Sequence, residues 1–336
     1  MAILLTGGLG YIGSHICAAL LPRGEELVVV DNLSNTSEDV LPRLRAITGR
    51  EPAFHQLDLR DSGALSAVFD RYPIDCVIHL AGLKAVGESV SKPLAYYDAN
   101  LGGTLSLCRV MDAHGVRRLV FSSSAAVYSA GNAMPVSESG RTGDCINPYS
   151  WSKYMQEQLL RDLAAADARW SILLLRYFNP IGAHESGLIG EAPQGTPNNL
   201  LPYLTQVACG QRAYLSIYGN DYDTPDGTGV RDYLHVMDLA EGHIAAVDYT
   251  AAHHGAQAIN LGTGRGTSVL ELVHAFERVN GIPVPYRFAP RRPGDLPTCY
   301  ADAQLSAQLL HWRARRSLDD MLRDAWRWQQ TLQKNT

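Results

Sequence analysis

The sequence predicts an α/β fold in which a doubly wound parallel sheet is joined to a second, smaller α/β lobe. Short apolar, β-branched runs alternate with helical patterns in the first part of the 336-residue chain, and a glycine-rich turn directly follows the first run. Beyond Asn179-Pro180 the chain changes to loops rich in Gly, Pro and Asn. We therefore expect a sheet domain over residues 1–180 and a ligand-contacting lobe over residues 181–336.

Six segments are expected to form the strands of the sheet. Runs that are apolar throughout, such as Leu27–Val30, are typical of strands buried on both faces. His235–Asp248 has a helical pattern and Ala258–Leu261 the pattern of a strand, so the segment over about 235–261 could rejoin the first domain. A last helix is expected at Leu318–Leu332. The six strand segments are Ala2–Thr6, Leu27–Asp31, Phe54–Asp58, Cys76–Ala81, Leu119–Ser123 and Ile172–Tyr177.

Composition argues against several classes of protein. A net charge of −5 and a pI near 6.1 give no attraction for nucleic acid or for an anionic membrane surface. The six cysteines show no Cys-x-x-Cys spacing and no histidine pair at zinc-ligand intervals, so we expect neither a disulfide framework nor a metal site. We see no signal-peptide pattern and no apolar run near the roughly 18 residues of a membrane helix, which predicts a cytoplasmic protein.

A phosphate-binding turn is expected directly after the first strand. Gly7, Gly10 and Gly13 permit a tight turn and let backbone N–H groups approach a pyrophosphate at the positive end of a helix. Asp31, at the end of the second strand, can accept hydrogen bonds from both ribose hydroxyls and would repel a 2′-phosphate, which favours NAD over NADP. Asp58, expected to end the third strand, could accept the adenine amino group or be an ordinary turn residue.

A proton-transfer site is expected on a helix that begins after Asn147 and Pro148, where Tyr149 and Lys153 share one face. A phenol has a pKa near about 10, and an ammonium about 4 Å away in an effective dielectric of about 20 lowers it by roughly 3 units. With an oxidised nicotinamide, Lys153 would make Tyr149 a general base, and Ser124 would pass the proton to it from a substrate hydroxyl. The alternative is a surface helix that carries a tyrosine and a lysine.

Seven stretches spread along the chain carry a resemblance to one known family. They are Thr6–Ser14, Asp31–Asn35, Ala81–Ser89, Arg176–Pro180, Pro197–Leu200, Gly227–Tyr233 and Ala289–Pro297. In these stretches the sequence resembles the UDP-glucose 4-epimerase family of the extended short-chain dehydrogenase/reductase superfamily. The C-terminal stretches are specific to this narrow family, and the resemblance covers the chain essentially end to end.

The resemblance implies an isomerase that interconverts UDP-glucose and UDP-galactose with a bound NAD, on a Rossmann-type NAD-binding domain. Tyr149 would take the proton of the sugar 4-hydroxyl while a hydride leaves C4, and the 4-keto sugar would turn and receive the hydride on its other face. The implied catalytic residues are Tyr149, Lys153 and Ser124. The implied NAD contacts are Gly7, Gly10, Tyr11, Ile12, Gly13, Asp31, Asn32, Asn35, Thr36, Asp58, Leu59, Leu80, Ala81, Gly82, Lys84, Ser122, Ser124, Tyr149, Lys153, Tyr177 and Phe178.

The resemblance also implies a set of substrate contacts in the second lobe. Arg231 and Arg292 match contacts to the diphosphate, for which forked guanidinium donors are suited, although a surface salt bridge is the alternative for each. Asp295 matches a contact to the uridine ribose. The implied substrate contacts are Asn179, Asn199, Leu200, Ser216, Ile217, Tyr218, Arg231, Arg292, Asp295 and Cys299.

Several residues depart from the pattern of the family, and two of them, Ala99 and Cys299, bear on ligand contacts. Ala99 stands where an asparagine amide commonly contacts the nicotinamide side. Cys299 stands where a bulky tyrosine excludes a 2-acetamido group in some members, so we hypothesise that UDP-N-acetylhexosamines are also accepted. The alternative is that Cys299 is a packing residue behind another occluding side chain.

Two other functions compete with this interpretation. A nucleotide-sugar 4,6-dehydratase shares the glycine turn and the Tyr-x-x-x-Lys pair, but needs an acid/base carboxylate pair where Ser124 is followed by Ala125 and Ala126. A non-enzymatic dinucleotide-sensing protein would usually lack one residue of the catalytic pair. The resemblance further implies a homodimer that packs helices at Leu94–His114 and Ser150–Ala166. The apolar positions Leu159, Leu160 and Leu163 could serve that interface or the sheet.

Overall fold

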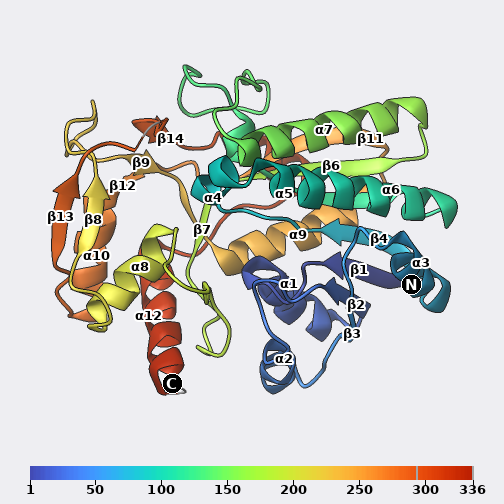
Figure 1. Cartoon of the computed structure of the whole chain (residues 1–336), viewed down its shortest axis with the longest axis horizontal. Helices are drawn as coiled ribbons and strands as arrows, with labels where there is room; N and C mark the ends of the chain where they lie inside the picture. Colours follow the sequence, from blue (N-terminus) through green and yellow to red (C-terminus); the bar gives the residue numbers. More distant parts are fainter. Residues whose placement is uncertain (293, 335–336) are drawn as a thin grey trace.

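The centre of the fold is a sheet of seven parallel strands in the order β11-β6-β5-β4-β1-β2-β3 (Figure 1). The structure is a computed structural model and describes residues 1–292 and 294–334. The strand expected at Ala258–Leu261 is part of β11 and pairs with β6, so a late segment of the chain completes the sheet. The strands are β1 (Ala2–Thr6), β2 (Glu26–Asp31), β3 (Ala53–Gln56), β4 (Ile74–His79), β5 (Arg118–Ser124), β6 (Ser171–Tyr177) and β11 (Gly255–Leu261).

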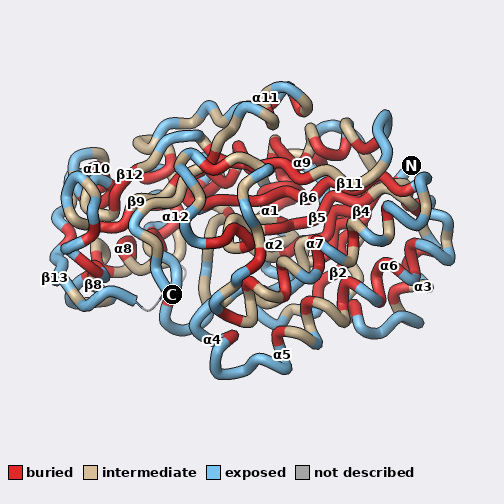
Figure 2. The backbone as a smooth tube through the Cα atoms, turned by 90° about the horizontal axis from the view of Figure 1, so that it is seen from above, coloured by how far each residue is buried: buried red, intermediate tan, exposed pale blue. Residues whose placement is uncertain are grey.

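Both faces of the sheet are covered, because successive side chains of each strand point to opposite faces. On β1, Leu5 lies in one hydrophobic cluster and Leu4 in the other. Figure 2 shows the strands buried at the centre and exposed turns on the outer helices. The first cluster is covered by α1 (Tyr11–Leu20), α2 (Val40–Thr48) and α9 (Val236–Thr250). The second is covered by α3 (Ser62–Arg71), α6 (Gly103–Ala113) and α7 (Pro148–Ala166).

The strand order reverses at β1, which lies between β2 and β4. At such a point the loops beyond the carboxyl ends of the strands separate and leave a crevice in which ligands bind. The glycine turn follows β1, and the three serines at 122–124 end β5. The fold therefore brings both regions of the predicted site to one edge of the sheet.

A smaller lobe lies at one end of this sheet and has its own hydrophobic cluster, which includes Phe276 and Leu322 (Figure 1). The division of the chain into domains at residue 180 stays a prediction. The helices of the lobe are α8 (Leu200–Ala208), α10 (Val269–Asn280) and α12 (Leu318–Lys334). Its paired strands are β7 (Asn179–Ile181) with β10 (Tyr233–His235), β8 (Leu215–Tyr218) with β13 (Tyr286–Ala289), and β9 (Val230–Arg231) with β12 (Thr267–Ser268) and β14 (Thr298–Cys299).

The helix expected over Leu94–His114 is present, but a π-helical turn interrupts it. α5 covers Pro93–Tyr97, a π-helical turn covers Asp98–Gly102, and α6 follows. The Asn100 side chain bonds the backbone N–H and carbonyl of Leu83 at 2.8 and 3.1 Å, which binds this turn to the loop after β4. A side chain committed to such contacts is a common cause of a local widening of the helix. The other short helices are Leu21–Arg23, α4 (Val86–Ser91), Ala125–Val127 and α11 (Gln304–Leu309).

Two strands end earlier than predicted. β3 ends two residues before Asp58, whose carboxylate accepts a hydrogen bond from the backbone N–H of Arg60 at 3.0 Å and so starts a turn. β4 ends two residues before Ala81, whose N–H bonds the Thr6 hydroxyl at 3.3 Å instead of a neighbouring strand. In both places a polar side chain bonds the backbone, and the backbone hydrogen bonds between neighbouring strands end there.

The apolar residues of α7 support the sheet. Leu160 is fully buried, and Leu159 and Leu163 pack partly buried against the same cluster. Of the two roles left open by the sequence, the structure favours core packing. Large apolar side chains exposed on α4 to α7 are instead Val86, Val90, Leu94, Leu105 and Met155.

Within residues 1–292 and 294–334, no helix is both long enough and apolar enough to cross a membrane. In the same part of the chain, no three His, Cys, Asp or Glu side chains gather in a way that could hold a metal ion. The six cysteines are free thiols, and three of them are buried.

Candidate active site

The glycine turn after β1 forms a cradle with room only for glycine. Gly7 has a φ of +69°, and a Cβ there would lie 2.8 Å from the backbone nitrogen of Ala81. A Cβ on Gly13 would lie 2.4 Å from the carbonyl oxygen of Gly7. Gly10 caps α1 through its backbone, and the first turn that starts at Tyr11 carries no acidic side chain. The N–H groups at this helix end therefore fit the pyrophosphate of a dinucleotide.

Asp31 ends β2 beside this cradle, and the backbone holds its carboxylate. The carboxylate accepts hydrogen bonds from the N–H groups of Leu9 at 3.2 Å and Leu33 at 3.0 Å. Burial raises the pKa of Asp31, and these backbone bonds oppose the shift. Nearby, the Thr36 hydroxyl donates to the carbonyl of Leu9 at 2.7 Å, and Asn35 is exposed. A carboxylate fixed in this way fits ribose hydroxyl donors and disfavours a further phosphate.

Arg60, which the sequence did not single out, organises the region around Asp58. Arg60 Nε donates to Asp58 at 2.9 Å, and Asn32 Nδ2 donates to the same carboxylate at 3.2 Å. The Arg60 side chain holds the pKa of Asp58 well below its usual range. Arg60 also pairs with Asp98 of the π-helical turn. Asp58 is thus a turn residue with a fixed charge, and its contact with an adenine stays a prediction.

Three consecutive serines at the end of β5 each meet a different turn of α7. The hydroxyl of Ser124 acts on the phenol of Tyr149 and lowers its pKa. The carbonyl of Ser122 accepts a bond from Lys153 Nζ at 2.7 Å. The hydroxyl of Ser123 donates to Glu157 at 2.5 Å. The cap at Asn147, whose side chain accepts from the Ser150 N–H, starts α7 where the sequence predicts. Residues four apart on one helical face therefore align with the strand end.

Burial dominates the electrostatics of the catalytic pair. It raises the pKa of Tyr149, while the bond from Ser124 and the charge of Lys84 oppose the shift. Burial also lowers the pKa of Lys153 to about 8, against the effect of Glu157. We expected Lys153 to supply the charge that lowers the pKa of Tyr149, but in the chain alone Lys84 does so. The reason is that the Lys153 ammonium is directed to the carbonyl of Ser122 and lies 4.8 Å from the Phe121 ring centre.

A buried ion pair stands behind the three serines. Arg176 on β6 donates to Glu157 through Nε at 2.9 Å and Nη2 at 2.7 Å, and the side chains are 3% and 4% exposed. Glu157 also accepts the bond from Ser123, so one carboxylate joins β5, β6 and α7. A two-pronged buried pair of this kind fixes direction as well as distance. It holds the strand end that carries Ser124.

The loop after β4 and the end of β6 provide the walls near the catalytic pair. A Cβ on Gly82 would lie 2.9 Å from the Asn100 amide oxygen, so the loop passes close to the π-helical turn. Tyr177 and Phe178 are buried, and the Tyr177 hydroxyl is bonded to His243. The half-buried Cys299 packs against the cluster that contains Phe178. The packing of Cys299 is thus observed, and its effect on the size of the substrate stays a prediction.

The two arginines of the second lobe lie with the aspartate predicted beside them. Arg231 on β9 is 3.8 Å from Asp295, and Arg292 is 3.5 Å from the same carboxylate. The Arg292 guanidinium also lies over the Tyr218 ring, 4.4 Å from its centre. Cys299 is paired with Arg231 in the sheet. The structure therefore gathers five predicted substrate contacts that are far apart in the sequence.

The remaining predicted contacts divide by burial. Asn179 and Asn199 are exposed, and Lys84 and Ser216 are at least partly exposed, so their polar groups are available to ligands. Four apolar side chains pack in or against the hydrophobic cores, two of them buried and two half-buried. They are Ile12, Leu59, Leu80 and Ile217, and Leu200 is likewise packed at the edge of the lobe's cluster.

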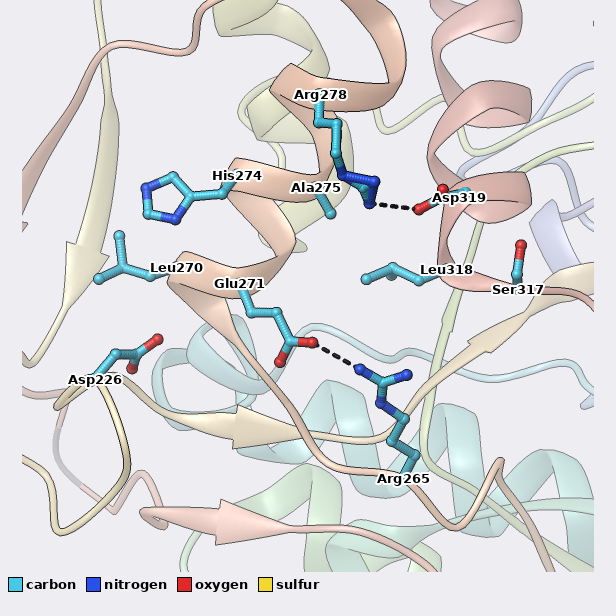
Figure 3. Close-up of a pocket in the computed structure, with 10 residues that line it drawn as sticks. All are labelled: Asp226, Arg265, Leu270, Glu271, His274, Ala275, Arg278, Ser317, Leu318 and Asp319. Atoms are coloured by element: carbon cyan, nitrogen blue, oxygen red, sulfur yellow. Dashed lines mark hydrogen bonds and ion pairs between the residues drawn. The ribbon is translucent and has the colours of Figure 1, made fainter.

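A hollow of about 760 Å³ lies away from all these residues, between α10 and the start of α12 (Figure 3). Its charged side chains are largely paired with one another: Arg265 with Glu271 at 2.9 Å and Arg278 with Asp319 at 2.8 Å. No residue of the predicted site lines it. This hollow is therefore not part of the candidate active site.

Comparison with known proteins agrees with this arrangement. Residues 3–262 match the NAD dependent epimerase/dehydratase family. The chain belongs to this family. Within it, the chain is 57% identical over 329 residues to the UDP-glucose 4-epimerase of Bacillus subtilis, which covers 98% of this chain and 97% of that relative.

Two solved structures of the family have nearly the same fold. The UDP-glucose-4-epimerase from Stenotrophomonas maltophila, with bound NAD and formylated UDP-arabinopyranose, has a TM-score of 0.98 at 48% identity and full coverage of both chains. The UDP-glucose 4-epimerase from Bifidobacterium longum, in complex with NAD+ and UDP, has a TM-score of 0.96 at 49% identity, again over both full chains.

Sequence reasoning missed four charged residues of the site: Arg60, Glu157, Arg176 and Glu191. Glu157 could have been found, because it continues the four-residue spacing of the catalytic pair along α7. Arg176 was noted only as part of a family stretch. Glu191 accepts bonds from both Lys84 and Asn199 and had no local signal in the sequence.

Proposed function

We propose that this chain epimerises UDP-glucose and UDP-galactose at C4 and that NAD is its bound cofactor. The observation that carries the proposal is the placement of Ser124, Tyr149 and the buried Lys153 together, at the edge of the sheet where the glycine cradle also lies. The high identity to UDP-glucose 4-epimerases over nearly the whole chain supports it. NAD is supported by the cradle at Gly7 and Gly13, by Asp31, and by the NAD in both solved relatives.

In this proposal the residues of the chain move a proton and hold the sugar. NAD, when bound, supplies a hydride acceptor at C4 of the sugar and returns the hydride later. Ser124 receives the proton of the 4-hydroxyl and passes it to Tyr149, which stores it and gives it back. Lys84 supplies positive charge that favours ionised Tyr149, against the effect of burial. Lys153, on the same face of α7, is proposed to add to this charge when NAD is bound. No net oxidation results, so the product is the C4 epimer.

The nucleotide must be held tightly and the hexose loosely, because the sugar has to turn and present both of its faces to NAD. Arg231 and Arg292 are proposed to hold the diphosphate, and Asp295 the uridine ribose. Since Asp295 is 3.5 and 3.8 Å from the two guanidinium groups, their donors can turn to phosphate oxygens at little cost. The hexose is then tethered at one end and free to rotate.

The small side chain of Cys299 supports a wider substrate range. Cys299 is half-buried against the cluster that contains Phe178, and it is smaller than a tyrosine by most of an aromatic ring, a difference in size that suits a 2-acetamido group. We therefore propose UDP-N-acetylhexosamines as additional substrates.

The exposed apolar side chains on the consecutive helices α4 to α6 support a homodimer, since apolar residues gathered on one surface are typical of an interface. Leu94 is 82% exposed and Val90 is 64% exposed. Sedimentation of the protein with Leu94→Asp should show monomer where the unchanged protein shows dimer. The cytoplasmic location stays a prediction.

One assay tests the proposed activity. UDP-galactose and UDP-N-acetylgalactosamine are supplied in parallel without added NAD, and the products are separated and identified by mass. We expect UDP-glucose from the first and UDP-N-acetylglucosamine from the second. A 4-keto-6-deoxy sugar would point to a dehydratase instead, and no turnover with NAD added would contradict the proposal.

A further inference from the structure

A single carboxylate, Glu191, joins the cofactor side of the site to its substrate side. Its Oε1 accepts a hydrogen bond from Lys84 Nζ at 2.9 Å and another from Asn199 Nδ2 at 2.6 Å. Lys84 also lies 5.9 Å from the ring centre of Tyr11, another proposed NAD contact. Donors from the two sides of the site therefore converge on one oxygen atom.

The last helix of the chain holds Glu191 in place. Trp328 Nε1 on α12 donates to the backbone oxygen of Glu191 at 3.0 Å. A Cβ on Gly190 would lie 2.4 Å from the Trp328 ring, so only glycine can pack against the indole there. Gly190 also forms a β-bridge with Ala183. The Glu191 side chain is 10% exposed and that of Lys84 is 56% exposed, so the carboxylate is the enclosed partner.

We propose that Glu191 is a positioning residue that orients Lys84 and Asn199 together, so that one enclosed charge sets both the cofactor contact and the substrate contact. The inference rests on the proposed function, because it takes Lys84 as a contact to NAD and Asn199 as a contact to the nucleotide sugar. An ammonium has three N–H donors and an amide nitrogen has two. With one donor of each directed to Glu191, the remaining donors have a defined direction.

The charge of Glu191 also reaches the proton-transfer end of the site. Lys84 lowers the pKa of Tyr149, in opposition to the larger effect of burial. Glu191, 2.9 Å from the ammonium, neutralises part of this charge. Without the carboxylate, Lys84 would lower the pKa of Tyr149 further. A contact that is only structural would change substrate affinity and leave this pKa unchanged.

The test is Glu191→Gln, which keeps the size of the side chain and removes its charge. With UDP-glucose, KM should rise about tenfold while kcat changes less than about threefold. The acid limb of the kcat/KM profile should move to lower pH, because it reports the pKa of Tyr149 in the free enzyme. Calorimetric titration with UDP should show binding weakened about tenfold.

Two further variants distinguish the positioning role of Glu191 from a general effect of removing a carboxylate from this loop. In a Lys84→Met background, Glu191→Gln should no longer move the acid limb of the kcat/KM profile. The Lys84 ammonium, which Glu191 partly neutralises, is absent from that background. Glu185→Gln is the matched control on the same loop. Within the described residues, the Glu185 carboxylate is bonded to neither Lys84 nor Asn199, and the variant should behave as the unchanged protein.

Trp328→Phe removes the hydrogen bond to the backbone oxygen of Glu191 and leaves the carboxylate itself unchanged. This variant tests the same role where Glu191→Gln does not fold. Loss of the indole N–H should loosen the Glu191 loop and raise KM about threefold, with kcat unchanged.

Unchanged KM, UDP affinity and acid limb in Glu191→Gln would overturn the inference, as would an equal effect of Glu185→Gln. Where Glu191→Gln does not fold, an unchanged KM in Trp328→Phe would overturn it. A wild-type protein without epimerase activity would overturn the proposed function instead, and the UDP titration would still decide the role of Glu191.

Discussion

The proton-transfer lysine, Lys153, is buried and closely bonded to the end of β5, whereas the arginines of the nucleotide clamp are partly exposed and loosely paired. Lys153 is 5% exposed and its Nζ is 2.7 Å from the carbonyl oxygen of Ser122. Arg292 is 56% exposed, and its Nε is 3.5 Å from a carboxylate oxygen of Asp295. The two groups lie in one candidate site but differ in burial and in the length of their contacts.

The difference corresponds to the two tasks proposed for these regions. Proton transfer requires heavy atoms held within hydrogen-bond reach, which a closely bonded and water-excluding environment provides. A diphosphate clamp must exchange its resting partner for the ligand, and exposed ion pairs cost little to break. We therefore expect changes in the first region to lower kcat and changes in the second to raise KM.

The largest effect is expected from Tyr149→Phe, which would sharpen the comparison most. Loss of the phenolic hydroxyl should lower kcat by about 10²- to 10⁴-fold and leave KM for UDP-glucose within about threefold. Steady-state kinetics of the conversion of UDP-galactose measures both. Tyr154→Phe, on the same helix but packed against Trp151, is the control and should keep full activity. A Tyr149→Phe protein as fast as the wild type would refute the proton-transfer role.

Lys153→Met should lower kcat about a hundredfold, because the buried ammonium is lost. Burial lowers the pKa of Lys153 from 10.5 to about 8, so the wild-type rate should decline as the pH rises through about 8. Between these values the unfolded chain binds this proton and the folded chain does not. The free energy of unfolding of the wild type should therefore rise with pH relative to the variant over that window. The free energies of unfolding of both proteins can be measured by urea titration across this pH window. A difference between wild type and Lys153→Met that does not change with pH would contradict the prediction.

Arg292→Ala would test the clamp. Removal of its charged donors should raise KM for UDP-glucose about twentyfold, with kcat changed less than about threefold. Arg291→Ala is the matched control, because Arg291 pairs with Asp221 at 2.7 Å and stacks on Tyr222 instead. The control should keep the wild-type KM. A fall in kcat as large as that of Lys153→Met would break the comparison between the two regions.

The smallest of the four effects is expected from Cys299→Tyr, which acts where the two regions meet. The larger ring should occlude the position proposed for the 2-acetamido group and lower the rate with UDP-N-acetylglucosamine about tenfold, while the rate with UDP-glucose stays within about threefold. The ratio of kcat/KM for the two substrates measures the change. Equal losses on both substrates would assign Cys299 to packing alone.

Much of the fold was predictable because its signals are local. The cap at Asn147 starts α7 as expected, and the alternation of apolar runs and helical patterns predicted the sheet. The π-helical turn at Asp98–Gly102 was not predictable, because it depends on contacts of Asn100 with a loop that precedes it by many residues. The early ends of β3 and β4 likewise depend on polar contacts that compete with the strand pattern.

The sequence by itself determined the spacing of Gly7, Gly10 and Gly13 and the shared helical face of Tyr149 and Lys153, since both depend on residues within two turns of each other. Only the tertiary structure decided that Glu157 meets Arg176 and that Glu191 receives both Lys84 and Asn199. These partners come from different elements of the fold. Local periodicity reports which way a side chain faces, but the packing of strands and helices determines which charge it meets.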